Sequence, residues 1–533
     1  MREPAKILIT ALALVALTGA TANNKPMTER QRALHVLNRL AFGPRPGEVD
    51  KVMQLGVDDW IEQQLRPDSI SDRGVDARLQ QFATLKMSSN EIVAKYYVPV
   101  VEARREVQRA AKDDPEMSKQ DEQEMRREVR AKLAPGLQPQ QPFRELIAQR
   151  IVRAADSDRQ LNEVMIDFWM NHFNVFSGKG IDRYLLTSFE RDTIRPHIWG
   201  RFEDLLMATA KSPAMLFYLD NARSVAAPEN RPQVASRRFA ARRMNQDPNA
   251  NAGREGLNEN YARELMELHT LGVDGGYTQK DVTELARVLT GWSIPRPREG
   301  NTGFVFRSYL HDTGAKTVLG VRFPAGGGIE EGERMIRILA HHPNTAHRIA
   351  YKLCQRLVAD EPPPALVDRV AKKFLDTDGD LRQTLRAVIK SPEFWDAKNY
   401  RAKVKSPFEY VVSAVRAVDA DVVDPTPLAR ALQQMGEPLY GAQPPTGYSD
   451  KADAWVNTGA LMNRLNFALA LAGNKLPGVS AKLAPEASVD ALAATLTGGN
   501  LTDETRNTIK ARAAQGAPMA AGLILGSPEF QRQ

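Results

Sequence analysis

Residues 143–173 read FRELIAQRIVRAADSDRQLNEVMIDFWMNHF, and this stretch decides the fold class. Its apolar side chains recur at intervals of three and four residues, which is the period of an amphipathic α-helix. The same spacing returns along most of the chain. The further segments with this pattern are 33–40, 49–65, 91–111, 118–133, 330–339, 345–357, 365–374, 381–389, 407–418 and 458–471. We therefore predict a mainly α fold, a large unit built from many helices.

A small β-hairpin is predicted near residues 304–323. Phe304-Val305-Phe306 and Thr317-Val318-Leu319 are short runs of strand-forming residues. They flank His311-Asp312-Thr313-Gly314, whose Asp and Gly suit a turn. No repeat of fixed period and no domain-dividing linker is visible, so residues 28–533 are expected to form one helical domain.

Residues 223–256 interrupt the helical pattern with a concentration of arginine. Seven arginines stand there against three acidic residues, among many Pro, Asn, Gly and Ala residues. This composition predicts a mobile loop between helices. Two interpretations stay open, because a long loop is either a solvated insertion or a lid, here an arginine-rich flap over an anionic ligand.

The first 22 residues have the features of a secretory signal peptide. Arg2 and Lys6 precede an apolar run from Ile7 to Leu17, and Ala20-Thr21-Ala22 supplies the small-x-small pattern that signal peptidase requires. The run is shorter than the roughly 20 residues that span a bilayer, and no later segment is apolar enough to do so. We expect cleavage near Ala22, a periplasmic or secreted protein and no stable membrane span.

Charge and cysteine content exclude two further classes of protein. The formal net charge is +7, of which Arg2, Glu3 and Lys6 contribute +1, so the expected mature chain carries +6. An exported protein of this size with so small a charge is not expected to bind nucleic acid. Cys354 is the single cysteine, which excludes an intrachain disulfide, and its helical apolar surroundings predict a buried, inert thiol.

Residues 258–272, NENYARELMELHTLG, form the richest polar cluster. Asn258 is suited to cap a helix and Gly272 to end it. Glu264 and Glu267 lie on one side of this helix, whereas His269 points about 140–160° away on ideal geometry, so a straight helix cannot bring the three to one metal ion. Glu264 borders the buried face and needs a partner there or has a function.

Two histidine motifs each allow a structural and a functional interpretation. His172 continues an apolar helical stripe, which suits either a hydrogen-bonded core histidine or an imidazole that faces a pocket. His311 and Asp312, at the expected hairpin turn, are either a base with its orienting carboxylate or turn residues. Convergence of these histidines with Glu264 would create a metal or acid/base site. The identity of any metal or cofactor stays unknown.

The familiar catalytic signatures are missing from the sequence. It contains no His-Glu-x-x-His, no Gly-x-Ser-x-Gly, no phosphate-binding loop with lysine and no cysteine pair for zinc. Asp376-Thr377-Asp378-Gly379-Asp380 departs from a calcium loop because its glycine comes two places early and Ala387 stands where the bidentate glutamate belongs. Asp380 is better explained as the cap of the helix that follows.

Several blocks resemble the bacterial domain-of-unknown-function 1800 (DUF1800) family, in order over roughly residues 30–530. The blocks are Phe168–Phe173, Asn258–Asn260 with Ala262–Glu264, Thr270–Gly272, Leu289–Trp292, His311–Gly314, His342–Ala346, Ser391–Phe394 and Trp455–Gly459. The resemblance implies an exported, mostly helical protein. It also implies a genetic association with a second, sulfatase-like exported family, and some relatives carry carbohydrate-binding modules.

Two functional hypotheses follow. The first is an envelope enzyme, hydrolase-type, that acts on a glycan or another anionic polymer. The alternative is a non-catalytic scaffold or chaperone-like partner of another exported, sulfatase-like protein. For the first, the candidate catalytic residues are Glu264, His172, His311 and Asp312, and the candidate ligand-binding residues are Asn171, Asn258, Glu259 and Arg263.

Overall fold

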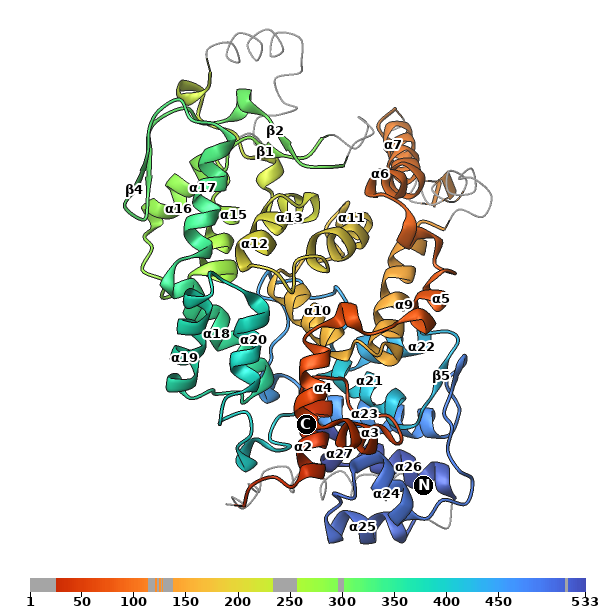
Figure 1. Ribbon diagram of the computed structural model, residues 1–533. Helices are drawn as coiled ribbons and strands as arrows, with labels where there is room; N and C mark the ends of the chain where they lie inside the picture. Colours follow the sequence, from red (N-terminus) through yellow and green to blue (C-terminus); the bar gives the residue numbers. More distant parts are fainter. Residues whose placement is uncertain are drawn as a thin grey trace.

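Helices make up most of the chain that the structure, a computed structural model, describes (Figure 1). The described residues are 25–113, 120–121, 124–125, 127, 138–232, 256–295, 302–512 and 516–533. The predicted mainly α fold is confirmed. The predicted signal peptide, and residues 233–255 of the predicted arginine-rich loop, lie outside the described residues.

The last two helices of the N-terminal part, α9 and α10, cross the middle of the molecule. The stretch 143–173 forms these two helices instead of one, because Ser157 is extended and Gln160 Nε2 donates to the free carbonyl oxygens of Ala154 (3.0 Å) and Ser157 (2.7 Å). The elements of this part are α2 (Glu29–Arg39), α3 (Glu48–Leu55), α4 (Val57–Gln64), η1 (Pro67–Ser69), α5 (Arg73–Leu79), η2 (Ala83–Lys86), α6 (Ser89–Ile92), η3 (Val93–Tyr97), α7 (Val98–Asp113), α9 (Gln141–Asp156) and α10 (Gln160–His172).

The central helices include the predicted polar helix. Asn258 caps it by accepting the backbone N–H of Asn260 (2.8 Å), and Gly272 follows its end at a φ of +90°. After Glu264 the helix widens into a π turn. The central elements are α11 (Asp182–Ser188), η4 (Phe189–Ile194), α12 (Phe202–Ala210), α13 (Pro213–Tyr218), η5 (Asn221–Arg223), η6 (Pro228–Asn230), α15 (Glu259–Glu264), η7 (Leu265–Thr270), α16 (Gln279–Val288), η9 (Ser308–Leu310), α17 (Ile329–Ala340), α18 (Pro343–Leu357), α19 (Pro364–Asp376), α20 (Leu381–Ile389) and η10 (Ala397–Asn399).

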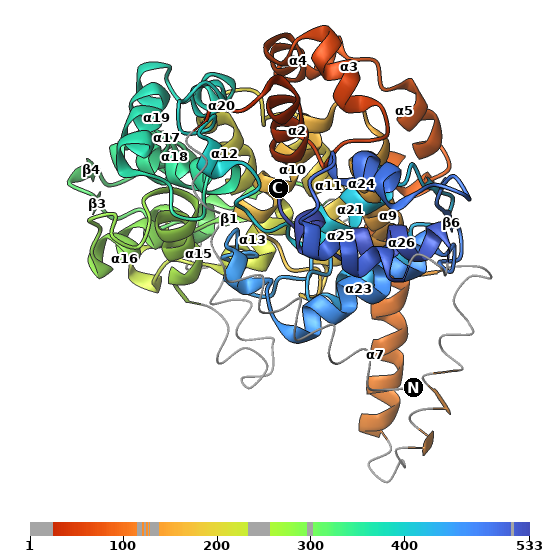
Figure 2. The ribbon, with the colours of Figure 1, turned by 90° about the horizontal axis from the view of Figure 1, so that it is seen from below.

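The C-terminal helices gather on one side, shown in blue in Figures 1 and 2. They are α21 (Pro407–Ala417), α22 (Thr426–Gln434), η11 (Ala452–Ala454), α23 (Thr458–Ala472), α24 (Val489–Thr497), α25 (Asp503–Lys510), α26 (Ala517–Leu525) and α27 (Pro528–Gln531). Their apolar faces form a hydrophobic cluster with residues of α9, separate from the larger cluster formed by α2 to α20. Cys354 lies buried in the larger cluster, as predicted.

Three two-stranded antiparallel sheets contain the strands of the described residues. They pair β1 (Trp292–Ser293) with β2 (Val305–Phe306), β3 (Lys316–Val318) with β4 (Val321–Phe323), and β5 (Asp421–Val422) with β6 (Val479–Ser480). The predicted hairpin near 304–323 is present as β3–β4, but the expected pairing of 304–306 with 317–319 is wrong. Leu319 and Gly320 both have positive φ and close a tight turn directly after β3, so β2 pairs back to β1 instead.

None of the helices among the described residues combines the length and the apolar character needed to cross a membrane. Helix α7 extends away from the body in Figure 2, and all of its described side chains except Val107 are partly or fully exposed. This exposure agrees with its many charged residues, which need no protein partner in water.

Candidate functional site

His172 ends α10 inside the larger core. Its Nε2 lies 3.2 Å from the carbonyl oxygen of His269, its Nδ1 has no hydrogen-bond partner among the described residues, and its ring stacks on Phe168. Burial, followed by the positive charge of Lys352, lowers the pKa of His172 well below its usual range. His269 is also buried, and its pKa falls to about 3. Both imidazoles are therefore neutral near pH 7 and cannot act as proton donors there.

Asn171, at the end of α10, forms hydrogen bonds with the loop of residues 442–448. Its side-chain amide donates to the carbonyl oxygen of Tyr448 (2.8 Å) and its side-chain oxygen accepts the N–H of the same residue (2.7 Å). Asn174 adds hydrogen bonds to the carbonyl oxygens of Ala442 (3.0 Å) and Pro444 (2.8 Å). These contacts use the polar groups of Asn171 to hold residues 442–448 in place.

The other predicted ligand-binding residues also contact protein groups. Asn258 caps α15 and donates to the carbonyl oxygen of Leu219 (3.1 Å). Glu259 accepts hydrogen bonds from Gln279 (2.7 Å) and Thr283 (2.7 Å) of α16. Arg263 donates to Gln279 (2.9 Å) and lies 3.8 Å from Glu259. These residues join α15 to α16 at the surface.

Glu264 differs from these residues because its carboxyl group has no hydrogen-bond or ion-pair partner in the described part of the chain. It is partly exposed, and no hydrogen bond or ion pair joins it to another described residue. Burial raises the pKa of Glu264, and the neighbouring Glu267 raises it further. Glu267 accepts a hydrogen bond from the Tyr277 hydroxyl (3.2 Å). The two carboxyl groups of one helix thus have different surroundings.

Asp312 lies in a buried network between α16 and α17. Arg287 donates to both of its oxygens, Nε to Oδ2 and Nη2 to Oδ1, each at 2.9 Å. Asn230 and the backbone N–H of Gly314 donate two more hydrogen bonds (3.0 and 2.9 Å). Burial opposes ionisation of Asp312, but these donors outweigh it and lower its pKa. Both oxygens of this carboxylate therefore accept hydrogen bonds from other groups of the protein.

His311 contacts a different carboxylate. Its Nδ1 lies 2.8 Å from the carbonyl oxygen of Thr290, and its Nε2 lies 3.2 Å from Oε2 of Glu331. The buried Lys316 donates to the same Glu331 oxygen (2.6 Å) and to the carbonyl oxygen of Asp312. His311 and Asp312 are therefore neither a base with its orienting carboxylate nor the turn of a hairpin.

The predicted catalytic residues do not form one cluster. His172 contacts His269, and His311 contacts Glu331, but no hydrogen bond or ion pair among the described residues joins these two groups or joins either to Glu264. Within the same part of the chain, no group of three or more His, Cys, Asp or Glu side chains is placed to hold a metal ion. The described residues thus offer no ready-made metal site.

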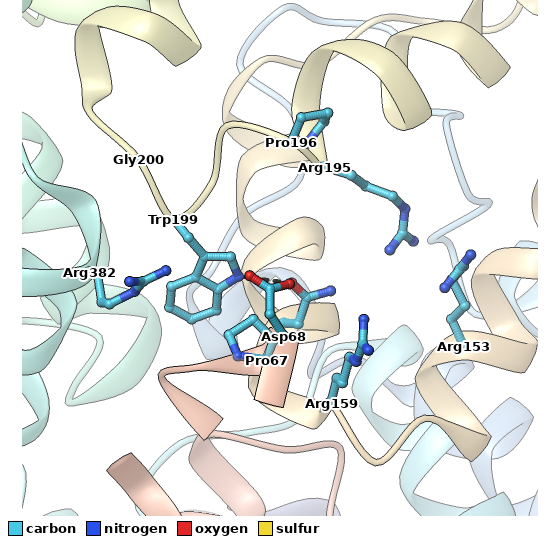
Figure 3. A pocket seen from close by; sticks show the side chains of 10 residues that line it. Pro67, Asp68, Arg153, Arg159, Arg195, Pro196, Trp199, Gly200 and Arg382 are labelled. Atoms are coloured by element: carbon cyan, nitrogen blue, oxygen red, sulfur yellow. Dashed lines mark hydrogen bonds between the residues drawn. The ribbon is translucent and has the colours of Figure 1, made fainter. Parts of the chain in front are cut away.

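A cavity of about 460 Å³ lies elsewhere, at the N-terminal end of α10 (Figure 3). Four arginines line it together with Trp199 and Asn162: Arg153, Arg159, Arg195 and Arg382. Arg195 is paired with Glu163 (2.9 Å) and Glu190 (2.6 Å). The other three have no ion-pair partner among the described residues, so the cavity wall is rich in positive charge.

Comparison with known protein families supports the resemblance seen in the sequence. The family described as "Protein of unknown function (DUF1800)" matches residues 35–532. The chain belongs to the DUF1800 family. No curated protein and no solved structure matches it.

Several DUF1800 blocks serve helix ends in this structure. His342 Nδ1 accepts the N–H of Asn344 (3.1 Å) at the start of α18, and the Asn457 side chain accepts the N–H of Ala460 (2.8 Å) at the start of α23. Asn221 donates to the carbonyl oxygens that flank the Leu289–Trp292 block, at 3.2 and 3.0 Å. These DUF1800 residues satisfy backbone groups that a helix leaves unpaired.

Sequence reasoning missed the arginine cavity. Arg153 lies within the helical stretch 143–173, Arg159 follows the break in that stretch, and Arg382 lies in a distant helix. Each occupies a position where a surface arginine is ordinary. What distinguishes them is that none forms an ion pair with a carboxylate of the described residues, and a single sequence does not contain this three-dimensional information.

Proposed function

We propose that the protein is an exported, hydrolase-type protein of the bacterial envelope that acts on a glycan or another anionic polymer, with Glu264 as its proton donor. The observation that carries the proposal is the state of Glu264. Its carboxyl group is accessible and unpaired among the described residues, and burial and Glu267 raise its pKa. A carboxylic acid that retains its proton at higher pH is suited to general acid catalysis.

The neighbouring Glu267 suits the complementary role. Glycoside hydrolysis needs one protonated carboxyl group and one ionised carboxylate, and different surroundings are what separate the two states. In the proposed reaction Glu264 gives its proton to the glycosidic oxygen as the bond to the anomeric carbon breaks. Water adds its oxygen to that carbon and releases a proton to Glu267, whose carboxylate the Tyr277 hydroxyl holds (3.2 Å).

The assignment to the envelope rests on the N-terminal sequence. A positive start, a short apolar run and Ala20-Thr21-Ala22 together suit export and cleavage. Expression in a bacterium with a C-terminal tag, followed by N-terminal sequencing of the periplasmic fraction, is expected to give a chain that begins near residue 23. Recovery of uncleaved chain from the cytoplasm alone would contradict export.

Hydrolysis is tested with a matched pair of variants. We would measure the release of reducing ends from a panel of uronic-acid-containing and sulfated polysaccharides and from peptidoglycan. Glu264→Gln is expected to abolish the release while the melting temperature stays unchanged, because Glu264 contributes no hydrogen bond or ion pair within the described residues. Glu361→Gln is the control, since Glu361 is exposed and its one ion pair within the described residues is with the surface residue Lys451. Absence of release by wild type, or full activity of Glu264→Gln, would overturn the hydrolase proposal.

One observation favours the second candidate, a scaffold or chaperone-like partner for another exported, sulfatase-like protein. Asn171, Asn258, His311 and Asp312 all use their polar groups to join segments of this chain. Such residues fix helix packing and need no substrate. Affinity purification from envelope extracts would recover a stoichiometric partner under this hypothesis, and a monodisperse protein without a partner would contradict it.

A further inference from the structure

We propose that the arginine cavity at the N-terminal end of α10 binds a phosphate or sulfate group carried on a small, sugar-sized molecule. The site is separate from Glu264, and its argument does not depend on the proposed hydrolase activity. It rests on the charge, the geometry and the size of the cavity.

The charge balance of the cavity wall is positive. Arg195 pairs with two buried carboxylates, Glu163 and Glu190, whereas the neighbouring Arg150 pairs with Asp167 (2.9 Å). Arg153, Arg159 and Arg382 remain, and the lining residues include one carboxylate, the exposed Asp68. The lining therefore contains four positive groups and one negative group that water screens, with Glu163 and Glu190 paired to Arg195.

The local contacts leave the terminal guanidinium nitrogens available. Arg153 donates through Nε to Gln149 (3.0 Å), and Arg159 through Nε to the carbonyl oxygen of Ile70 (2.8 Å). These contacts orient the side chains without neutralising them. The pKa of Arg153 is lowered by burial and then by the charge of Arg195, and the carboxylates of Glu163, Glu190 and Asp76 oppose this lowering only in part. An anion in the cavity would relieve both effects.

The arrangement of the side chains suits an oxyanion. Figure 3 shows Arg153, Arg159 and Arg195 approaching one space from different directions, with Arg382 on the other side of Trp199. A guanidinium group presents two parallel N–H donors, which match the oxygen atoms of phosphate and sulfate. Two free guanidinium groups that face one space can therefore hold several oxygens of one tetrahedral anion.

The volume indicates that the ligand is larger than the anion itself. The cavity of about 460 Å³ falls in the range of small-molecule sites, roughly 300–1,000 Å³. Pro67, Pro196 and Trp199 supply an apolar wall beside the arginines. A phosphate or sulfate ester of a sugar suits a cavity with a charged side and an apolar side. Its anion would lie at Arg153 and Arg159, and its organic part would lie along the apolar wall.

Isothermal titration calorimetry at constant ionic strength tests the site in the full mature chain. The probes are glucose 6-phosphate, glucose, inorganic phosphate and inorganic sulfate. We expect glucose 6-phosphate to bind and glucose not to bind, and Arg153→Gln and Arg159→Gln each to weaken binding at least about tenfold. Arg322→Gln is the matched control, because Arg322 is exposed on β4 and far from the cavity, and it should bind like wild type.

The outcomes distinguish a free anion from an ester, and they distinguish this proposal from the hydrolase proposal. Equal binding of inorganic phosphate and glucose 6-phosphate, lost in the variants, supports the oxyanion site but overturns the sugar-sized part of the ligand. Tighter binding of glucose 6-phosphate supports an ester. Arg153→Lys keeps the charge but loses the paired donors, so intermediate binding supports the geometry even if Arg159→Gln folds poorly. No binding of any anion, or binding unchanged in the glutamine variants, overturns the proposal. Glu264→Gln should bind like wild type, which keeps this test independent of the hydrolase test.

Discussion

Replacement of Asp312 by Asn is expected to destabilise the segment around β2 and β3 by about 3 kcal/mol. The carboxylate is buried and accepts four hydrogen bonds, two of them from Arg287. An asparagine offers one oxygen and one N–H₂ group, so part of these donors would lose their acceptor. Removal of one partner of a buried ion pair costs about 3–5 kcal/mol. Arg287 keeps Glu284 (2.8 Å) and is 19% exposed, which places the cost at the lower end.

Hydrogen exchange measured by mass spectrometry shows which segment of the chain loses stability in Asp312→Asn. A cost of about 3 kcal/mol corresponds to roughly 100-fold faster exchange in peptides that cover residues 307–320. Asp376→Asn is the control, because Asp376 pairs with Lys372 at the surface (52% and 74% exposed) and such pairs contribute less than about 1 kcal/mol. If Asp312→Asn exchanges no faster than the control, the structural role that we assign to this network is wrong.

Three further predictions concern other buried groups. Burial, and then Asp167, raises the pKa of Glu437 to about 8. Its unfolded-state pKa is near 4.3, so the folded state binds the extra proton and stability falls as pH rises from about 4.3 to about 8. In urea unfolding Glu437→Gln should lack this decline, and an unchanged pH profile would contradict the assignment. Burial raises the pKa of the Cys354 thiol to about 12, so a thiol reagent at pH 8 should modify Cys354 only after denaturation; modification of native protein would refute its burial. Asn171→Ala removes both hydrogen bonds to Tyr448 and should speed amide exchange in residues 442–448 at least tenfold, whereas an unchanged rate would exclude the fastening role.

The helices could be predicted because their signals are local. Apolar spacing, the cap at Asn258 and the cap at Asp380 all depend on residues within one or two helical turns. The break between α9 and α10 was missed because the apolar spacing continues across it, while the hydrogen bonds from Gln160 stabilise the interruption. The pairing of β2 was also missed, since its partner β1 lies before residues 304–323 and strands of two residues carry little pattern.

The candidate site was less predictable because polar residues acquire their roles from distant partners. His311 and Asp312 are neighbours in sequence, yet one contacts Glu331 and the other Arg287. The arginine cavity shows the same dependence on distant partners, because Arg153, Arg159 and Arg382 come from separate positions of the chain and none of them forms an ion pair with a described residue. Glu264 was identifiable from its position at the edge of the buried face, but its lack of a partner among those residues needed the structure.

The most direct test of the proposed acid is a titration of Glu264 itself. Mature protein labelled with ¹³C at the glutamate carboxyl carbons would be titrated by NMR, and the Glu264 signal assigned by difference from Glu264→Gln. We predict a pKa above the ordinary value of about 4.3, because burial and Glu267 both disfavour the charged form. In Glu267→Gln the pKa of Glu264 should fall, since the neighbouring charge is gone. A pKa at or below about 4.3 in wild type, or no response to Glu267→Gln, would contradict the account of Glu264 as a proton donor.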